Sequence, residues 1–423
     1  MSVWIKAALL LACAPALASA QPSALKFDFG SDRVAPGYTH VLPTTIYTKK
    51  LGYGFDLGSR VTAVDRGGDD PLRSDFCTSS QPFYFSVALA EGNYNVTVIL
   101  GDLSGETATS IKAESRRLML ENVKTAKGQF ATRAFTVNVR TPKIAGDRQV
   151  RLKPRERGPP LVPDWDDKLM LEFNGARPCV CAVEITKADD AITLFLAGDS
   201  TVTDQPNEPW NSWGQMLPRF FKPRVAVANH AESGESLKSF LDAKRLEKIF
   251  SAMKAGDYLF IQFGHNDQKD RARNAGAFTS YKTNLMRYIA EARKRGGLPA
   301  VLTPMERKAG VSNDTLGEFP AAARAAAKEA NVPLIDLHSM SKVLYAALGP
   351  NLDKAFQDGT HHNNYGSYEL ARCVVAGIKE NKLAIARFLV DDIGPFDPAH
   401  PDSIESFSVP ASPMKSSVKP EGN

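Results

Sequence analysis

The spacing of apolar and polar residues changes near residue 190 and divides the chain into two parts. Between residues 25 and 188, short segments alternate apolar and polar positions and are separated by turn residues. These segments are LKFDFG, PFYFSVAL, YNVTVIL, RAFTVNVR, LMLEF and CAVEITK. Alternation with a period of two predicts strands buried on one face, and many short strands at this spacing are typical of an all-β sandwich.

From residue 191 onward, near-continuous apolar runs are followed by stretches with helical periodicity. The apolar runs are ITLFLAGD, RVAVANHA, DYLFIQFGHND, LPAVLTPM and VPLIDL. Strands that are apolar on both faces and alternate with amphipathic helices predict an α/β fold, with a doubly wound parallel sheet covered by helices on both sides. The pattern therefore predicts an all-β sandwich domain over 21–188 and an α/β domain over 189–390.

The two ends of the chain differ from these domains. The first twenty residues contain Lys6, a short apolar run and Ala18-Ser19-Ala20, which is the layout of a cleaved signal peptide. We therefore expect a secreted or periplasmic protein. Residues 391–423 are rich in proline and serine, which predicts a disordered tail. No apolar run is long enough to cross a bilayer, so no membrane partner is expected.

The basic residues are unevenly spread along the chain. The net charge is +5, but residues 112–157 alone carry 13 Lys/Arg against 4 Asp/Glu. Such a stretch is usually a set of solvated strand faces, although it would also attract an acidic polymer. No nucleic-acid-binding motif accompanies it, which favours an acidic polysaccharide over nucleic acid as a partner.

Four cysteines follow the signal peptide. Cys179 and Cys181 alternate along one strand and should face the same side, which is a poor geometry for a bond between them. In an oxidising compartment we expect Cys77 to bridge to one of the two. Cys373 fits the apolar face of a helix. A C-x-C pair also occurs in metal sites, but no other Cys or His lies near it in sequence, so neither a metal nor another cofactor is expected.

Polar residues with catalytic chemistry follow the predicted parallel strands at their carboxyl ends, where open α/β sheets bind ligands. Gly198-Asp199-Ser200 follows the first strand, Ser233-Gly234 the second and Gly264-His265-Asn266-Asp267 the third. Asp358-Gly359-Thr360-His361 lies near the end of this part. A serine, a glycine, an asparagine and an Asp/His pair thus arrive in the order that an ester hydrolase needs.

Each of these residues has a defined task in ester hydrolysis. Ser200 needs a base to become a nucleophile, and His361 is the candidate base. Asp358, three residues earlier, can bind the other ring nitrogen and fix the tautomer. Candidate oxyanion-hole donors are the backbone N–H groups of Ser200 and Gly234 and the side-chain amide of Asn266. Taken alone, the serine and asparagine also fit helix caps and the glycine fits a turn.

These four segments resemble the sequence blocks of the SGNH, or GDSL-like, hydrolase superfamily, which are G-D-S, a glycine, G-x-N-D and D-x-x-H. The resemblance covers about residues 191–385. GDSTV, WGQMLP and GHND are similar to the rhamnogalacturonan acetylesterase branch of carbohydrate esterases. KFDFG and the strand pattern resemble the galactose-binding-like, or malectin-like, domains found beside such esterases. The family spacing selects His361 rather than the adjacent His362 as the base.

The resemblance implies a flavodoxin-like α/β/α sandwich and a serine ester hydrolase without a metal. Its expected substrate is an acetylated acidic plant polysaccharide such as rhamnogalacturonan or pectin. The alternatives are a pectin methylesterase, a lipase or thioesterase, for which the chain offers no apolar lid, and an inactive carbohydrate-binding relative, against which the intact triad argues. The chain departs from the family at Glu235, where a basic residue commonly contacts the polysaccharide.

Overall fold

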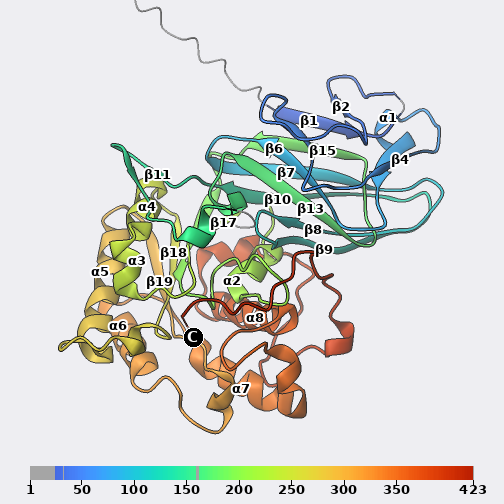
Figure 1. The fold of residues 1–423 in the computed structure, drawn as a ribbon. Coiled ribbons are helices and arrows are strands. Elements are labelled where there is room, and N and C mark those ends of the chain that lie inside the picture. The colour runs from blue at the N-terminus through green and yellow to red at the C-terminus, as the bar shows by residue number, and fades with distance from the viewer. Residues whose placement is uncertain (1–23, 32, 159–161, 423) are drawn as a thin grey trace, which may run out of the picture.

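The computed structural model describes residues 24–31, 33–158 and 162–422, which form two differently built domains side by side (Figure 1). The predicted signal peptide, residues 1–20, lies outside the described residues. Within the described part of the chain, no helix has the length and apolar character needed to cross a membrane. The architecture changes between the last strand of the first domain, which ends at Lys187, and the first strand of the second, which begins at Ile192.

The N-terminal domain is a sandwich of two five-stranded sheets, so the predicted all-β architecture is confirmed. One sheet has the strand order β10-β7-β15-β1-β2 and the other the order β3-β6-β13-β8-β9. β1 pairs parallel with β2, whereas the other pairs of these two sheets are antiparallel. The bounds are β1 (Ala24–Phe29), β2 (Thr39–Val41), β3 (Tyr53–Asp56), β6 (Phe83–Ala88), β7 (Gly92–Gly101), β8 (Thr107–Ala113), β9 (Arg117–Thr125), β10 (Phe130–Val139), β13 (Lys168–Arg177) and β15 (Ala182–Lys187).

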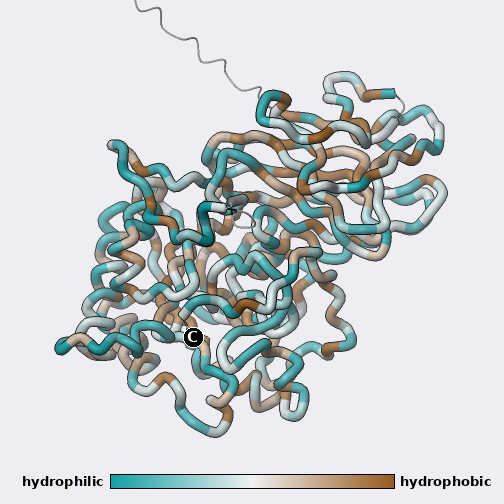
Figure 2. The backbone as a smooth tube through the Cα atoms, in the orientation of Figure 1, coloured by the Kyte–Doolittle hydropathy of each residue, from teal (hydrophilic) through white to brown (hydrophobic). Residues whose placement is uncertain are grey.

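The period of two in the strands fills the space between these sheets with aromatic rings. The ring centroids of Phe29 in β1 and Phe85 in β6 lie 4.8 Å apart, and Phe83 stacks on Phe173 of β13 at 5.1 Å. Polar residues dominate the outer loops (Figure 2). The smaller elements of this domain are β4 (Thr62–Asp65), α1 (Pro71–Ser74), β5 (Asp75–Thr78), β11 (Lys143–Ile144), β12 (Arg148–Gln149) and β14 (Cys179–Val180).

The C-terminal domain is built on a five-stranded parallel sheet with the order β17-β16-β18-β19-β20. This is the 2-1-3-4-5 order of flavodoxin-like folds, so the predicted doubly wound sheet is confirmed. The strands are β16 (Ile192–Gly198), β17 (Val225–Asn229), β18 (Tyr258–Gln262), β19 (Leu298–Leu302) and β20 (Leu334–Ile335). The helices are α2 (Trp213–Met216), α3 (Leu237–Asp242), α4 (Arg245–Ala252), α5 (Lys282–Arg293), α6 (Phe319–Ala330), α7 (Leu337–Leu348) and α8 (Asn364–Glu380).

Helices cover both faces of this sheet (Figure 1). Leu194 and Leu196 of β16 belong to the core beneath α2, α7 and α8. Phe195 and Ala197 of the same strand point to the opposite face and pack in the core beneath α3, α4, α5 and α6. Burial on both faces explains why these strands are continuously apolar in the sequence.

Buried ion pairs join the two domains. Arg117, at the start of β9, contacts Asp204 of the α/β domain at 2.6 Å and Asp164 at 3.1 Å. Arg116 donates from Nη1 to the carbonyl oxygens of Gln205 at 3.0 Å and Trp210 at 2.9 Å. The β-sandwich therefore holds the loop that follows the first parallel strand.

The expectation of a solvated basic surface is wrong for part of residues 112–157. Four of the 13 basic side chains in this stretch are buried at the domain interface or beside it, namely Lys112, Arg116, Arg117 and Arg140. Their charges meet carboxylates or carbonyl oxygens, or, for Arg140, the face of Trp165 at 4.7 Å. They are not available to attract a polymer.

The prediction of a disordered tail is also wrong, because residues 391–422 pack along the body of the molecule (Figure 1). Ser412 is 1% exposed, and its hydroxyl lies within 2.9 Å of both carboxylate oxygens of Glu172. Lys112 donates to Ser412 Oγ at 2.7 Å and to the carbonyl oxygen of Pro410 at 2.6 Å. The tail thus completes the hydrogen bonds of charges that the β-sandwich buries.

The expected disulfide is absent among the described residues, where all four cysteines are free and buried. Cys77 of β5 pairs directly with Val180 of β14. Cys179 and Cys181 flank that valine and therefore point to the other face of the strand. Both of their sulfur atoms face the carbonyl oxygen of Gly101, at 3.7 and 3.5 Å. Cys373 of α8 is buried in the hydrophobic core of the α/β domain, as its place on the apolar face of the predicted helix indicates.

Truncation of the chain after residue 393 is expected to lower its stability, contrary to what the composition of the tail indicates. The buried Lys112 and Glu172 would lose their contacts with Pro410 and Ser412, at a cost of about 1–3 kcal/mol for each unsatisfied group. Urea unfolding measures the difference. A chain ending at Val418 keeps these contacts and is the matched control. Equal unfolding midpoints for the full chain and the long truncation would show that the tail does not dock.

Candidate active site

The turn after β16 presents Ser200 at the end of the central strand. Gly198 is needed there, because a Cβ atom at this position would lie 2.5 Å from Cγ2 of Val202. Asp199 accepts hydrogen bonds from the backbone N–H of Thr201 at 2.9 Å and from its hydroxyl at 2.7 Å. The serine is 3% exposed. The turn is thus held by its neighbours, and the serine hydroxyl is left to contact another segment.

That segment is the Asp358–His361 loop. Ser200 Oγ lies 2.8 Å from His361 Nε2, and His361 Nδ1 lies 2.9 Å from Asp358 Oδ2. The other carboxylate oxygen, Oδ1, accepts from the backbone N–H groups of Thr360 and His361, each at 2.7 Å. Burial opposes ionisation, but these hydrogen bonds hold the pKa of Asp358 well below its ordinary value. A charged Asp358 keeps the proton on Nδ1, so Nε2 is the nitrogen that accepts from the serine hydroxyl.

His362, the adjacent histidine, faces a different environment. Its Nε2 lies 3.0 Å from the hydroxyl of Tyr345, and its ring centroid lies 3.9 Å from that of Phe356. Burial lowers its pKa to about 3, so the ring stays neutral at ordinary pH. His362 is therefore part of the core beneath the loop and not of the serine contact.

Hydrogen bonds connect the three segments that carry the candidate oxyanion donors, Ser200, Gly234 and Asn266. Gln205 donates from Nε2 to the carbonyl oxygen of Ser200 at 2.8 Å and to Ser233 Oγ at 3.4 Å. Gly234 follows with a φ of +78°, a backbone conformation that favours glycine. Asn266 Nδ2 donates to the carbonyl oxygen of Glu235 at 3.0 Å, which leaves its second amide hydrogen for a ligand. The ends of β16, β17 and β18 thus meet at one place.

Two further polar residues of the third block lie beneath this place. His265 Nδ1 is 3.3 Å from Asp199 Oδ2, and both side chains are buried. Burial raises the pKa of Asp199, but the contacts with His265 and Thr201 outweigh this effect and hold the pKa below its ordinary value. Asp267 Oδ1 accepts from the N–H of Leu237 at 3.0 Å and so joins the start of α3 to the loop after β18. Burial raises the pKa of Asp267 to about 7.

Three contributors to the site carry no clear signal in the sequence. Gln205 lies in a polar run after the serine, but nothing in that run indicates its bond to Ser200. Trp210 places its ring edge-on to His361, with centroids 5.9 Å apart. Lys153 lies between β12 and β13 of the β-sandwich domain, and its ammonium group donates to the carbonyl oxygen of Ser233, next to Gly234. Only the packing of the two domains brings it to the site.

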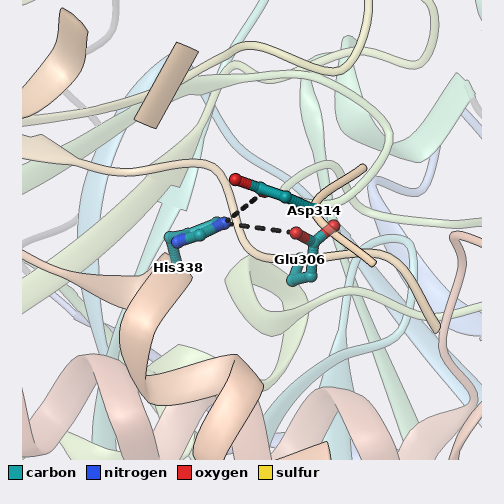
Figure 3. A group of neighbouring side chains, drawn as sticks. All are labelled: Glu306, Asp314 and His338. Carbon is teal, nitrogen blue, oxygen red and sulfur yellow. Dashed lines mark hydrogen bonds and ion pairs between the residues drawn. The ribbon is translucent and has the colours of Figure 1, made fainter. Parts of the chain in front are cut away.

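A cluster of Glu306, Asp314 and His338 has the composition of a metal centre (Figure 3). His338 Nε2 is 3.2 Å from Glu306 and 3.6 Å from Asp314. However, its Nδ1 lies 3.3 Å from Nη2 of Arg324, which can only donate. Nδ1 is therefore the acceptor, and Nε2 carries the proton that it gives to Glu306. A protonated ring nitrogen cannot bind a metal, so these residues fit a hydrogen-bond network better than a metal centre.

This cluster supports the loop that follows β19. Glu306 also accepts from the backbone N–H of Arg307 at 2.7 Å. Despite its burial, hydrogen bonds from His338, Thr315 and this N–H lower its pKa to about 2. Lys308, which follows Arg307, donates from its backbone N–H to the carbonyl oxygen of Gly359 at 3.0 Å. The cluster thus fixes the backbone at Arg307 and Lys308, which is hydrogen-bonded to the Asp358–His361 loop.

Two family models match the chain, one for each domain. Residues 196–367 match the GDSL-like Lipase/Acylhydrolase family. Residues 25–143 match the family described as Beta-agarase/YXIM esterase-like, galactose-binding domain-like. The matches cover the two segments from which the sequence predicts a hydrolase domain and a galactose-binding-like domain, and both resemblances are confirmed.

Esterases of Bacillus subtilis (strain 168) are among the relatives. Rhamnogalacturonan acetylesterase RhgT of Bacillus subtilis (strain 168) is 39% identical over 225 residues, which are 48% of this chain and 96% of that protein. The uncharacterized esterase YxiM of the same organism is 29% identical over 390 residues, which are 86% of this chain and 93% of that protein. The crystal structure of B. subtilis YxiM covers 85% of this chain and 99% of its own, with 26% identity and a TM-score of 0.45.

Replacement of Asp267 tests the electrostatics beneath the site. Its pKa of about 7 in the folded chain lies above that of an unfolded aspartate, so ionisation costs stability as the pH rises from about 4 to 7. Asp267→Asn keeps an oxygen for the Leu237 N–H and carries no charge. We expect its stability relative to the parent to increase over this pH range, by up to about 4 kcal/mol.

Urea unfolding at several pH values measures this difference. Asp69→Asn, on an exposed loop, is the control and should show no comparable trend. A stability difference for Asp267→Asn that stays constant with pH would contradict the raised pKa.

Proposed function

The chain belongs to the GDSL-like lipase/acylhydrolase family of carboxylic ester hydrolases, and we propose that it removes acetyl groups from a plant cell-wall polysaccharide. The observation that carries this proposal is the continuous hydrogen-bond chain from Ser200 Oγ to His361 at 2.8 Å and from His361 to Asp358 at 2.9 Å. A nucleophile, its base and an orienting carboxylate in this arrangement perform acyl transfer on several unrelated folds.

In the proposed reaction, His361 Nε2 takes the proton of Ser200 as Oγ attacks the acetyl carbonyl carbon. The negative oxygen of the tetrahedral intermediate accepts hydrogen bonds from the backbone N–H groups of Ser200 and Gly234 and from the amide of Asn266. His361 then gives its proton to the departing sugar hydroxyl. Water, activated by the same imidazole, releases acetate from the acetyl-serine. Asp358 stays charged throughout and stabilises the imidazolium.

Two observations support rhamnogalacturonan as the substrate class. The relative RhgT, named a rhamnogalacturonan acetylesterase, aligns over 96% of its own length at 39% identity. The galactose-binding-like domain is of a type that suits a glycan substrate. Export by the predicted signal peptide would bring the enzyme to such polymers outside the cell.

The products released from pectic material test the reaction. We expect the full chain to release acetate, and not methanol, from a rhamnogalacturonan-rich pectin that carries both acetyl and methyl esters. Enzymatic assays for the two products on the same sample make the measurement. Ser200→Ala is the control and should lose acetate release without a change in the unfolding midpoint. Methanol as the main product would assign the same triad to a methylesterase.

Replacement of the two adjacent histidines is expected to affect different properties, catalysis for His361 and stability for His362. His361→Ala removes the base, so kcat on a small aryl acetate should fall by about 10³-fold or more. His362→Ala removes the ring nitrogen that contacts the Tyr345 hydroxyl and opens a cavity beside Phe356. It should lower the free energy of unfolding by about 2–4 kcal/mol while retaining measurable hydrolysis. Kinetics and urea unfolding of both variants measure the two effects, and the reverse ranking would move the base to His362.

A further inference from the structure

The C-terminal segment reaches the proposed oxyanion site. It runs along the loop after Ser200, where Trp210 Nε1 donates to the carbonyl oxygen of Ser416 at 2.9 Å. Its last described residue, Gly422, is packed against two of the candidate oxyanion donors. A Cβ atom at Gly422 would lie 2.6 Å from Asn266 Oδ1 and 2.7 Å from Gly234 Cα. The last described residues therefore occupy space that a substrate would need.

Two lysines hold this end of the chain. Lys153 Nζ lies 3.0 Å from the carboxylate of Glu421. Lys269 donates to the carbonyl oxygen of Gly422 and lies 3.3 Å from Asn266 Oδ1. A carboxylate and a carbonyl of this chain thus contact the two ammonium groups, of which that of Lys153 lies beside Gly234 and that of Lys269 beside Asn266.

The position of Lys153 is fixed by buried groups. Its backbone N–H donates to Glu156 at 2.8 Å, and Glu156, which is 2% exposed, pairs with the fully buried Arg245. Its ammonium group donates to the carbonyl oxygen of Ser233. The side chain remains 22% exposed, so its charge is held at a defined place at the edge of the site.

One acidic neighbour partly balances this charge. Glu235 lies 3.4 Å from Lys153 Nζ, but it also accepts from the hydroxyl of Ser239 and lies 4.0 Å from Nε of Arg245. Glu235 is thus shared between two cations. Lys153 retains attraction for a second carboxylate, which in this structure is that of Glu421.

We propose that Lys153 and Lys269 form a subsite for the carboxylate of a uronic acid residue beside the acetylated sugar, and that Glu421 and Gly422 fill this subsite in the free enzyme. The proposal rests on the proposed function and adds the residues that select an acidic substrate. Lys153 lies between β12 and β13 of the β-sandwich domain and Lys269 follows β18 of the α/β domain, so the two domains build the subsite together. The C-terminal segment must leave before a polymer binds.

The test uses the full chain and a chain ending at Val418, which keeps the docked part of the tail and lacks Glu421. The substrates are acetylated rhamnogalacturonan oligosaccharides and the same oligosaccharides after chemical reduction of their carboxyl groups to alcohols. In both chains, we expect Lys153→Met to raise KM for the acidic substrate roughly 3- to 10-fold more than for the reduced one. The chain ending at Val418 should have a lower KM for the acidic substrate than the full chain.

Matched variants separate charge from packing. Lys153→Arg should restore most of the preference for the acidic substrate, because it keeps the positive charge. Lys124→Met, an exposed lysine of the same basic stretch, should leave the preference unchanged. Equal KM changes for the acidic and reduced substrates in Lys153→Met, or no change for either, would overturn the proposal.

A second measurement does not depend on the polymer being a substrate. Unacetylated oligogalacturonate should inhibit hydrolysis of a small aryl acetate by competition, and more weakly in Lys153→Met than in the parent. Inhibition with no acetate release from rhamnogalacturonan would leave the subsite standing and refute the proposed function. Acetate release with identical inhibition of parent and variant would refute the subsite alone.

Discussion

The buried charge of Arg117 constrains both domains at once. The side chain is 1% exposed, and its guanidinium contacts Asp204 and Asp164. A buried cation without its partners is costly, so the β-sandwich and the loop that holds Asp204 must dock together. Asp204 in turn accepts from Asn229 at 2.8 Å, and Asn229 donates to the carbonyl oxygen of Val202. The loop after the active serine is therefore fixed from the end of β17 and from the neighbouring domain.

Features encoded by short-range spacing were predictable from the sequence. The alternation of apolar and polar residues before residue 188 predicts the β-sandwich. The apolar runs followed by amphipathic helices after residue 191 predict the parallel sheet. The residues of the candidate site follow strands at their carboxyl ends, and Asp358 and His361 lie within one turn of each other. The structure brings these residues to one place, but their catalytic roles stay a prediction.

Features that depend on contacts distant in sequence were not predictable in this way. Arg117 and Asp204 are separated by 87 positions, so the sequence does not show that this basic residue is buried and not solvated. The tail has few apolar residues, and its composition predicts disorder. It docks instead through backbone carbonyls and the hydroxyl of Ser412, which complete the bonds of Lys112. Hydrogen bonds of this kind leave no trace in hydropathy.

The β-sandwich domain contributes a charged side chain, Lys153, to the edge of the candidate active site. RhgT is matched over 96% of its length by 48% of this chain. Glu235 follows Gly234 directly, and the ammonium group of Lys153 lies 3.4 Å from its carboxylate. This positive charge comes from the loop between β12 and β13 of the β-sandwich domain. Arg117 joins Asp164 of that loop to Asp204, and Glu156 of the loop pairs with Arg245, so a charge from outside the hydrolase fold has a defined place beside the site.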